Sequence, residues 1–87
     1  MNNDIDNLKK RLIYRSLYRG TKEMDKLVGS FVQTYIDNFN DTQLMELEKF
    51  LDIDDDTLYK FYNNQIIGTD LVHTEMLNLF KVFEYKQ

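Results

Sequence analysis

Apolar side chains recur every third or fourth residue along this chain, which is the spacing of one face of an α-helix. The clearest stretch contains Met24, Leu27, Val28, Phe31, Tyr35 and Phe39, with charged and amide side chains between them. Proline is absent and glycine occurs only three times, and so few backbone breakers are typical of helical proteins rather than of turn-rich β proteins. No segment alternates apolar and polar residues for long enough to predict a strand. The spacing therefore predicts an all-α fold.

Four other segments show the same spacing, and we predict one helix for each. Their apolar or small positions are, in chain order, Ile5, Leu8, Leu12 and Ser16; Leu44, Leu47, Phe50 and Leu51; Leu58, Phe61 and Tyr62; and Val72, Met76, Leu79, Phe80 and Phe83. Asn3 or Asp4 can cap the first of these helices, which should end near Tyr18. Thr69, directly after Gly68, can cap the last.

Two polar stretches mark the ends of the third helix. Asn40 and Gln43 have the spacing of a capping box, in which each side chain satisfies a free backbone donor of the other residue, so a helix should begin there. The stretch 52–56, which is acidic except at Ile53, should end it, because carboxylates favour the N-terminus of the helix that follows. We expect a single domain over residues 1–87, folded as a small five-helix bundle.

The net charge of −4 is unevenly distributed. Residues 1–30 carry seven basic and four acidic side chains, a balance of +3, whereas the remainder carries four basic and eleven acidic ones, a balance of −7. A nucleic-acid-binding protein needs a basic surface, so we expect no nucleic-acid partner, and the basic third is better suited to docking an acidic protein surface. Cysteine is absent, so we expect a cytoplasmic protein. No apolar run is long enough to cross a bilayer, so we expect no membrane insertion. We also expect the chain to be a monomer when free.

Motifs for catalysis or cofactor binding are missing from the sequence. The acidic stretch begins like a calcium loop at Asp52, but Thr57 and Asn63 stand where such a loop needs glycine and glutamate. His73 is the only histidine, and zinc sites draw on clusters of ligands. No glycine-rich loop can hold phosphates, and no strand-turn-helix elbow can present a nucleophile. We therefore expect no catalytic residue, no metal site and no tightly bound cofactor.

One segment carries a family resemblance. Arg19, Gly20 and Glu23 form an Arg-Gly-x-x-Glu motif between the first two helices, with Asp25 shortly after it. Together with the acidic stretch that leads into Leu58 and Phe61, this motif resembles the bacterial FAD assembly factor family SdhE, which is similar to the mitochondrial succinate dehydrogenase assembly factor. The similarity runs from about residue 9 to residue 83. Asp56 replaces a proline that is common in the family, Phe61 replaces a tryptophan, and Tyr18 replaces an arginine found in some members.

The resemblance implies a function. Members bind the flavoprotein subunit of succinate dehydrogenase, and often that of fumarate reductase, and promote covalent attachment of FAD to a histidine of that subunit. FAD would then belong to the partner, and this chain would not be an enzyme. The residues around Arg15 and Thr21 look most like alphaproteobacterial members, which implies a bacterial cytoplasm. A generic helical adaptor or an antitoxin-like partner is the alternative that composition also permits.

The same resemblance implies a partner-binding surface around the motif. Its expected members are Arg11, Arg15, Tyr18, Arg19, Gly20, Glu23 and Asp25. Tyr14 and Tyr18, which lie among arginines, are candidate surface anchors. We expect Arg19 and Glu23 to be exposed at the helix junction, so that alanine there costs under about 1 kcal/mol of stability. A purely structural reading is also open, in which Gly20 ends a helix with positive φ and Arg19 forms a surface ion pair with Glu23.

Overall fold

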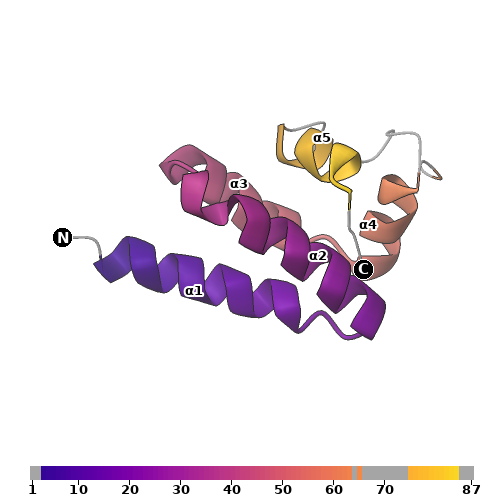
Figure 1. Ribbon diagram of the computed structural model, residues 1–87, viewed down its shortest axis with the longest axis horizontal. Helices are drawn as coiled ribbons and strands as arrows, with labels where there is room; N and C mark the ends of the chain where they lie inside the picture. The colour runs from indigo at the N-terminus through magenta and orange to yellow at the C-terminus, as the bar shows by residue number, and fades with distance from the viewer. Residues whose placement is uncertain (1–2, 64, 66–74, 85–87) are drawn as a thin grey trace.

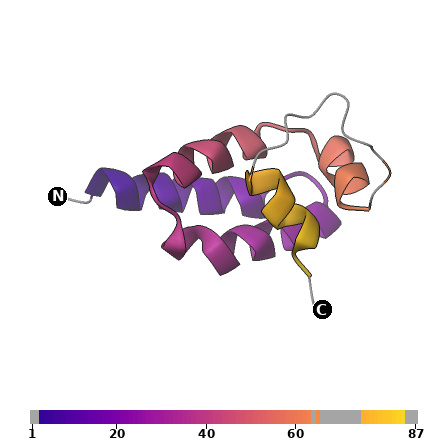
Figure 2. The same ribbon diagram turned by 90° about the horizontal axis from the view of Figure 1, so that it is seen from above.

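Three long helices lie side by side in the computed structural model, which describes residues 3–63, 65 and 75–84. The helices α1 (Asn3–Leu17) and α2 (Lys22–Tyr35) run antiparallel (Figure 1). The third helix, α3 (Asp41–Leu51), contacts α1. The shorter helices α4 (Asp55–Tyr62) and α5 (Glu75–Val82) lie toward the end of the bundle that is remote from the N-terminus (Figure 2). The described residues contain five α-helices and no strand, which confirms the predicted all-α fold.

Two predicted caps form as the sequence indicates. The Asn40 side chain accepts a hydrogen bond from the Gln43 backbone N–H at 2.8 Å, and Gln43 accepts one from the Asn40 N–H at 2.9 Å, so α3 begins with a capping box. Asp54 caps α4 by accepting a hydrogen bond from the Thr57 N–H. Each cap satisfies a backbone donor that the first turn of a helix leaves free. The predicted cap at Thr69 and the buried position Val72 lie outside the described residues.

The second helix is shorter than its apolar pattern suggests. It ends at Tyr35, a 3-10 turn follows over Ile36–Asn38, and Phe39 has an extended backbone with φ −80° and ψ 136°. The tighter turn is a common way to end a helix, and the extended residue leads directly into the cap of α3. Phe39 is still buried, so the core pattern was right although the backbone at this residue is not helical.

One aromatic cluster ties α2, α3 and α5 together. Phe31 is completely buried, and its ring centroid lies 5.4 Å from that of Phe50, 5.2 Å from Phe80 and 5.6 Å from Phe83. Such pairs contribute about 0.5–1.5 kcal/mol each beyond the burial of their surface. Three helices distant in sequence are therefore held by a shared contact at Phe31.

Gly29 brings the C-terminal part of α1 close to α2. It is buried, and a Cβ atom at this position would lie 2.7 Å from Leu17 Cδ2. Ser16, one residue earlier in α1, is also completely buried and donates a hydrogen bond from its hydroxyl to the Ile13 carbonyl at 2.6 Å. This tight packing fixes the end of α1, and with it the start of the Arg-Gly-x-x-Glu motif.

Candidate functional site

The exposed face of α1 carries an aromatic pair beside arginines. Tyr14 and Tyr18 are one helical turn apart, their ring centroids lie 4.5 Å apart, and they are 63% and 67% exposed. Between them, Arg15 donates a hydrogen bond from Nη2 to Asp52 Oδ1 at 2.6 Å. An exposed tyrosine pair next to guanidinium groups has the composition of a protein-binding surface. Tyr14 and Tyr18 are therefore suited to be surface anchors, as their positions in the sequence predicted.

Arg19 lies in a different environment from its neighbours. Its side chain is only 8% exposed, and its guanidinium crosses from the α1–α2 junction to the segment that joins α3 to α4. Nε donates to Asp55 Oδ1 at 2.7 Å, Nη1 donates to the Leu51 carbonyl at 2.6 Å, and Nη2 donates to the Ile53 carbonyl. The Leu51 carbonyl belongs to the last turn of α3, where carbonyls lack partners within the helix. Arg19 thus closes the end of α3 and anchors the start of α4.

This environment corrects the expectation that Arg19 is exposed. It also excludes the surface ion pair with Glu23, because the ion pair that Arg19 makes is with Asp55. The spacing of four residues suggested a partner within the motif, but a guanidinium has five N–H donors in a fixed fork, and here acceptors of the α3–α4 segment surround it. In place of a cost under about 1 kcal/mol, we therefore expect a larger loss of stability when Arg19 is replaced.

Gly20 and Asp25 shape the turn that follows Arg19. Gly20 has φ of 124°, a conformation that L side chains rarely adopt, so the expected positive φ is confirmed. Asp25 Oδ1 accepts hydrogen bonds from the backbone N–H of Arg19 and, at 3.3 Å, from that of Gly20. Thr21 then caps α2 by accepting from the Met24 N–H at 3.2 Å. The Asp25 carboxylate is thus engaged with the turn itself.

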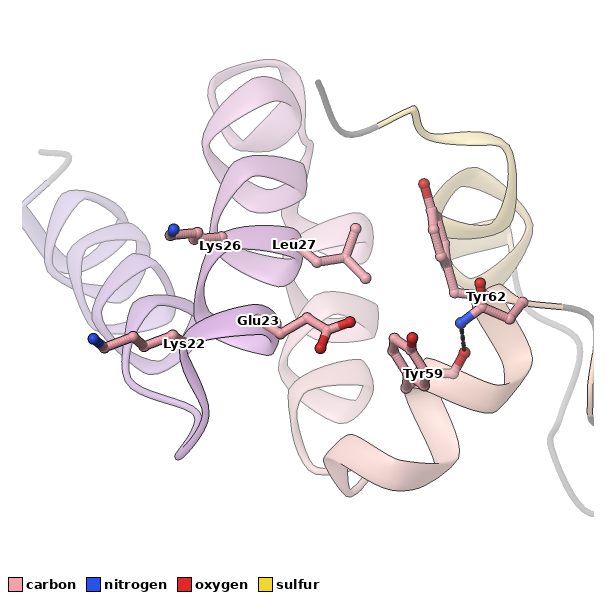
Figure 3. Close-up of a pocket in the computed structure, with 7 residues that line it drawn as sticks. Lys22, Glu23, Lys26, Leu27, Tyr59 and Tyr62 are labelled. Carbon is pink, nitrogen blue, oxygen red and sulfur yellow. Dashed lines mark hydrogen bonds between the residues drawn. The ribbon is translucent and has the colours of Figure 1, made fainter. Parts of the chain in front are cut away.

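Glu23 lies on the other side of the junction, in a groove between α2 and α4. The groove has a volume of about 490 Å³ and is lined by Lys22, Glu23, Lys26, Leu27, Tyr59, Tyr62 and Asn63. Figure 3 shows Glu23 and Leu27 pointing across the gap toward Tyr59 and Tyr62, whereas Lys22 and Lys26 point away from it. Glu23 is exposed, as expected. Within the part of the chain that the structure describes, its carboxylate has no ion-pair partner.

Neighbouring carboxylates of the acidic stretch have different partners. The Thr57 hydroxyl donates to Asp54 at 2.7 Å and the Thr57 backbone N–H donates at 3.1 Å. These hydrogen bonds hold the pKa of Asp54 below its ordinary value of 3.8. Asp55 holds Arg19, and Asp56 pairs with Lys60 at 3.0 Å. Among the described residues, no group of three or more histidine, cysteine or acidic side chains could hold a metal ion, and His73 lies outside them.

Comparison with known proteins identifies the family. Residues 10–84 match the model of the family described as the flavinator of succinate dehydrogenase. The chain belongs to this family. The resemblance that the Arg-Gly-x-x-Glu motif suggested is therefore confirmed.

Curated relatives of this flavinator-family chain carry the name succinate dehydrogenase assembly factor 2, mitochondrial. The protein of Aspergillus flavus is 38% identical over 56 residues, which are 64% of this chain and 19% of that protein. The protein of Dictyostelium discoideum is 30% identical over 76 residues, which are 87% of this chain and 54% of that protein. The chain thus spans from about a fifth to about half of the length of these relatives. No solved structure matches it significantly.

The residues expected to form the partner-binding surface of this family member do not form one continuous patch. Arg11, Arg15 and Tyr18 belong to α1 or its end, Arg19 is directed inward, and Glu23 lines the groove on α2. Between α1 and the α3–α4 segment lies an open depression of about 370 Å³, lined in part by Tyr14, Arg15 and Tyr18. The motif therefore contributes to two concave surfaces, with Arg19 in the lining of the depression and Glu23 in the lining of the groove.

Two tyrosines of α4 lie in the candidate site although they are not among the residues predicted from the sequence. Tyr59 and Tyr62 line the groove opposite Glu23. Their spacing of three residues places them on neighbouring parts of the α4 surface, which the sequence could have indicated. Nothing in the sequence indicates that this surface faces Glu23, because that juxtaposition follows from the tertiary fold, which places α4 on the other side of the groove from α2. The prediction of a bacterial cytoplasm stays a prediction; none of the described helices is both long and apolar enough to cross a bilayer.

Proposed function

We propose that this chain assists the assembly of succinate dehydrogenase by binding its flavoprotein subunit and promoting covalent attachment of FAD to that subunit. The observation that carries the proposal is the match of residues 10–84 to the flavinator family. The names of the curated relatives support the assembly role. The flavin bond forms on the flavoprotein, at a histidine, as the family resemblance implies.

The proposed mechanism is positioning. A binding protein can raise the rate of a reaction in its partner by favouring the conformation in which the reacting atoms meet. The two concave surfaces beside the motif offer the means: one presents the exposed Tyr14 and Tyr18 rings, and the other presents the Glu23 carboxylate. Arg19, Gly20 and Asp25 connect the structural elements that carry these surfaces, through the hydrogen bonds of the junction. FAD would be bound by the flavoprotein rather than tightly by this chain.

The test is a measurement of covalent flavin on the flavoprotein. The succinate dehydrogenase flavoprotein is produced in cells with and without this gene, and covalent flavin is read by fluorescence of the denatured flavoprotein band. We expect strong fluorescence only when the chain is present, and copurification of the chain with the flavoprotein. Equal fluorescence in both strains, without copurification, would reject the proposal and favour a generic helical adaptor.

Variants of the α1 surface make the test specific. Tyr18→Ala and Arg11→Glu alter exposed side chains and should each change the free energy of unfolding by less than about 0.5 kcal/mol. If this surface docks on the flavoprotein, both variants should lower covalent flavin while keeping the wild-type melting temperature. Gln33→Ala, an exposed position on α2, is the matched control and should behave as wild type.

A further inference from the structure

The groove between α2 and α4 has an uneven distribution of charge. Its α2 wall presents the Glu23 carboxylate next to Leu27, which is only 5% exposed, and its α4 wall presents the rings of Tyr59 and Tyr62 (Figure 3). The two lysines at its edge, Lys22 and Lys26, point away from the gap. The side chains that point into the gap therefore include a carboxylate and two aromatic rings, whereas both lysines are directed away from it.

The cation nearest in sequence to the α4 wall is already engaged. Lys60 pairs with Asp56 at 3.0 Å. Within the described part of the chain, Glu23 makes no ion pair. Among the described residues, this exposed carboxylate faces two aromatic rings and has no cationic partner, and both kinds of group attract positive charge.

The tyrosine rings are suited to hold such a cation. The Tyr62 hydroxyl donates a hydrogen bond to the Phe83 carbonyl at 2.5 Å, which fixes the ring and leaves the phenol oxygen free to accept. Tyr59 is 39% exposed and can offer a ring face to a ligand. A cation over a tyrosine ring gains electrostatic attraction from the π system, and the attraction grows when the cation loses water.

We propose that this groove receives an arginine side chain of the partner protein, with its guanidinium between the Glu23 carboxylate and the Tyr59 ring. Arginine fits better than lysine because its planar fork can bind a carboxylate through two N–H groups and also stack on an aromatic ring. The three methylenes of its side chain can lie over Leu27. The inference rests on the proposed function only for the identity of the protein that carries the arginine.

The first experiment uses the full chain alone. Isotope-labelled protein is titrated with N-acetyl-arginine amide and, in parallel, with N-acetyl-citrulline amide, which has the same shape but no charge. We expect saturable NMR shifts at Glu23, Leu27, Tyr59 and Tyr62 with the arginine compound only. The shifts should disappear in Glu23→Gln and persist in Glu48→Gln, a matched control at an exposed glutamate of α3. Equal shifts with the citrulline compound, equal shifts in Glu23→Gln, or no shifts at these residues would overturn the inference.

The second experiment measures binding of the succinate dehydrogenase flavoprotein by calorimetry. Glu23→Gln should weaken binding by roughly 30-fold or more, as expected when one member of a desolvated charge pair is removed. Tyr59→Leu, which keeps apolar bulk but removes the ring, should also weaken it, and Glu48→Gln should not. Wild-type affinity in both groove variants would overturn the groove inference and leave the proposed function intact. Absence of flavoprotein binding by the wild-type chain, together with arginine shifts in the first experiment, would reject the proposed function and support the groove.

Discussion

Arg19 and Glu23 belong to one motif and are four residues apart, yet the structure places them in opposite situations. The Arg19 side chain is 8% exposed and its three donating nitrogens all have acceptors on or beside the α3–α4 segment. Glu23 is exposed in a groove and makes no ion pair within the described residues. A short motif can thus contain one residue that stabilises the fold and another that is available to a partner. Loss of function on mutation has a different meaning at each.

The largest effect is expected for Arg19→Ala. This substitution leaves the Asp55 carboxylate and the Leu51 and Ile53 carbonyls without their donor, and we expect the free energy of unfolding to fall by about 2–4 kcal/mol. Urea unfolding followed by circular dichroism measures it. Arg11→Ala, at an exposed position of the same helix, should cost less than about 0.5 kcal/mol. Equal stability of the two variants would show that Arg19 is not part of the folded framework.

A smaller loss is expected for Gly20→Ala. Alanine would be strained at φ of 124°, and we expect a loss of about 1–2 kcal/mol. Space is not the limit, since the nearest atom to an added Cβ would be Asp55 Oδ2 at 3.9 Å. Gly20→Ser should therefore cost about as much as Gly20→Ala in the same unfolding experiment. A loss that grows steeply with side-chain size would point to crowding instead of backbone strain.

The α3–α4 segment should also respond to acid through Asp54. Hydrogen bonds from the Thr57 hydroxyl and backbone lower the pKa of this carboxyl in the folded state, so its contribution to stability is present above its ordinary value of 3.8 and is lost as the pH falls through the folded pKa. The melting temperature of wild type should exceed that of Asp54→Ala at pH 5, and this difference should shrink as the pH is lowered to 2.5. Asp54→Asn, which keeps an acceptor without a titrating group, should show no such pH dependence relative to Asp54→Ala. A constant difference between wild type and Asp54→Ala over this range would contradict the assignment.

The smallest effect on stability is expected for Glu23→Gln. Glu23 is exposed and has no ion pair among the described residues. The free energy of unfolding of the Glu23→Gln variant should therefore stay within about 0.5 kcal/mol of the wild-type value. Glu48→Gln on α3 should behave in the same way. Glu23→Gln and Arg19→Ala would then separate a binding defect from a folding defect. A loss of more than 1 kcal/mol in Glu23→Gln alone would mean that the carboxylate has a structural role.

Local signals in the sequence predicted most of the fold. The period of the apolar residues located the helices. Asn40 and Gln43 predicted the capping box of α3, and the acidic stretch 52–56 predicted the start of the next helix, which Asp54 caps. These features depend on residues that are close in the chain. The end of α2 was placed too late, because Phe39 keeps the apolar spacing after the backbone has left the helix.

The candidate site was predicted less completely because it depends on contacts between distant segments. Arg19 and Asp55 are 36 residues apart, and Glu23 faces Tyr59 only because the tertiary fold places α4 across the groove from α2. The exposed Tyr14 and Tyr18 were found because a single helix presents them. The inward direction of Arg19 could not be read from its neighbours in sequence, which include the exposed Arg11 and the half-buried Arg15.

A pair of double-mutant cycles tests most directly whether the motif is divided in this way. The free energy of unfolding is measured for Arg19→Ala, Asp55→Ala, Glu23→Ala and the two double variants that contain Arg19→Ala. We predict a coupling energy of about 1 kcal/mol or more between Arg19 and Asp55, and less than about 0.3 kcal/mol between Arg19 and Glu23. A larger coupling of Arg19 to Glu23 than to Asp55 would contradict the account, since it would mean that the two motif residues pair with each other and that Glu23 is not available to a partner.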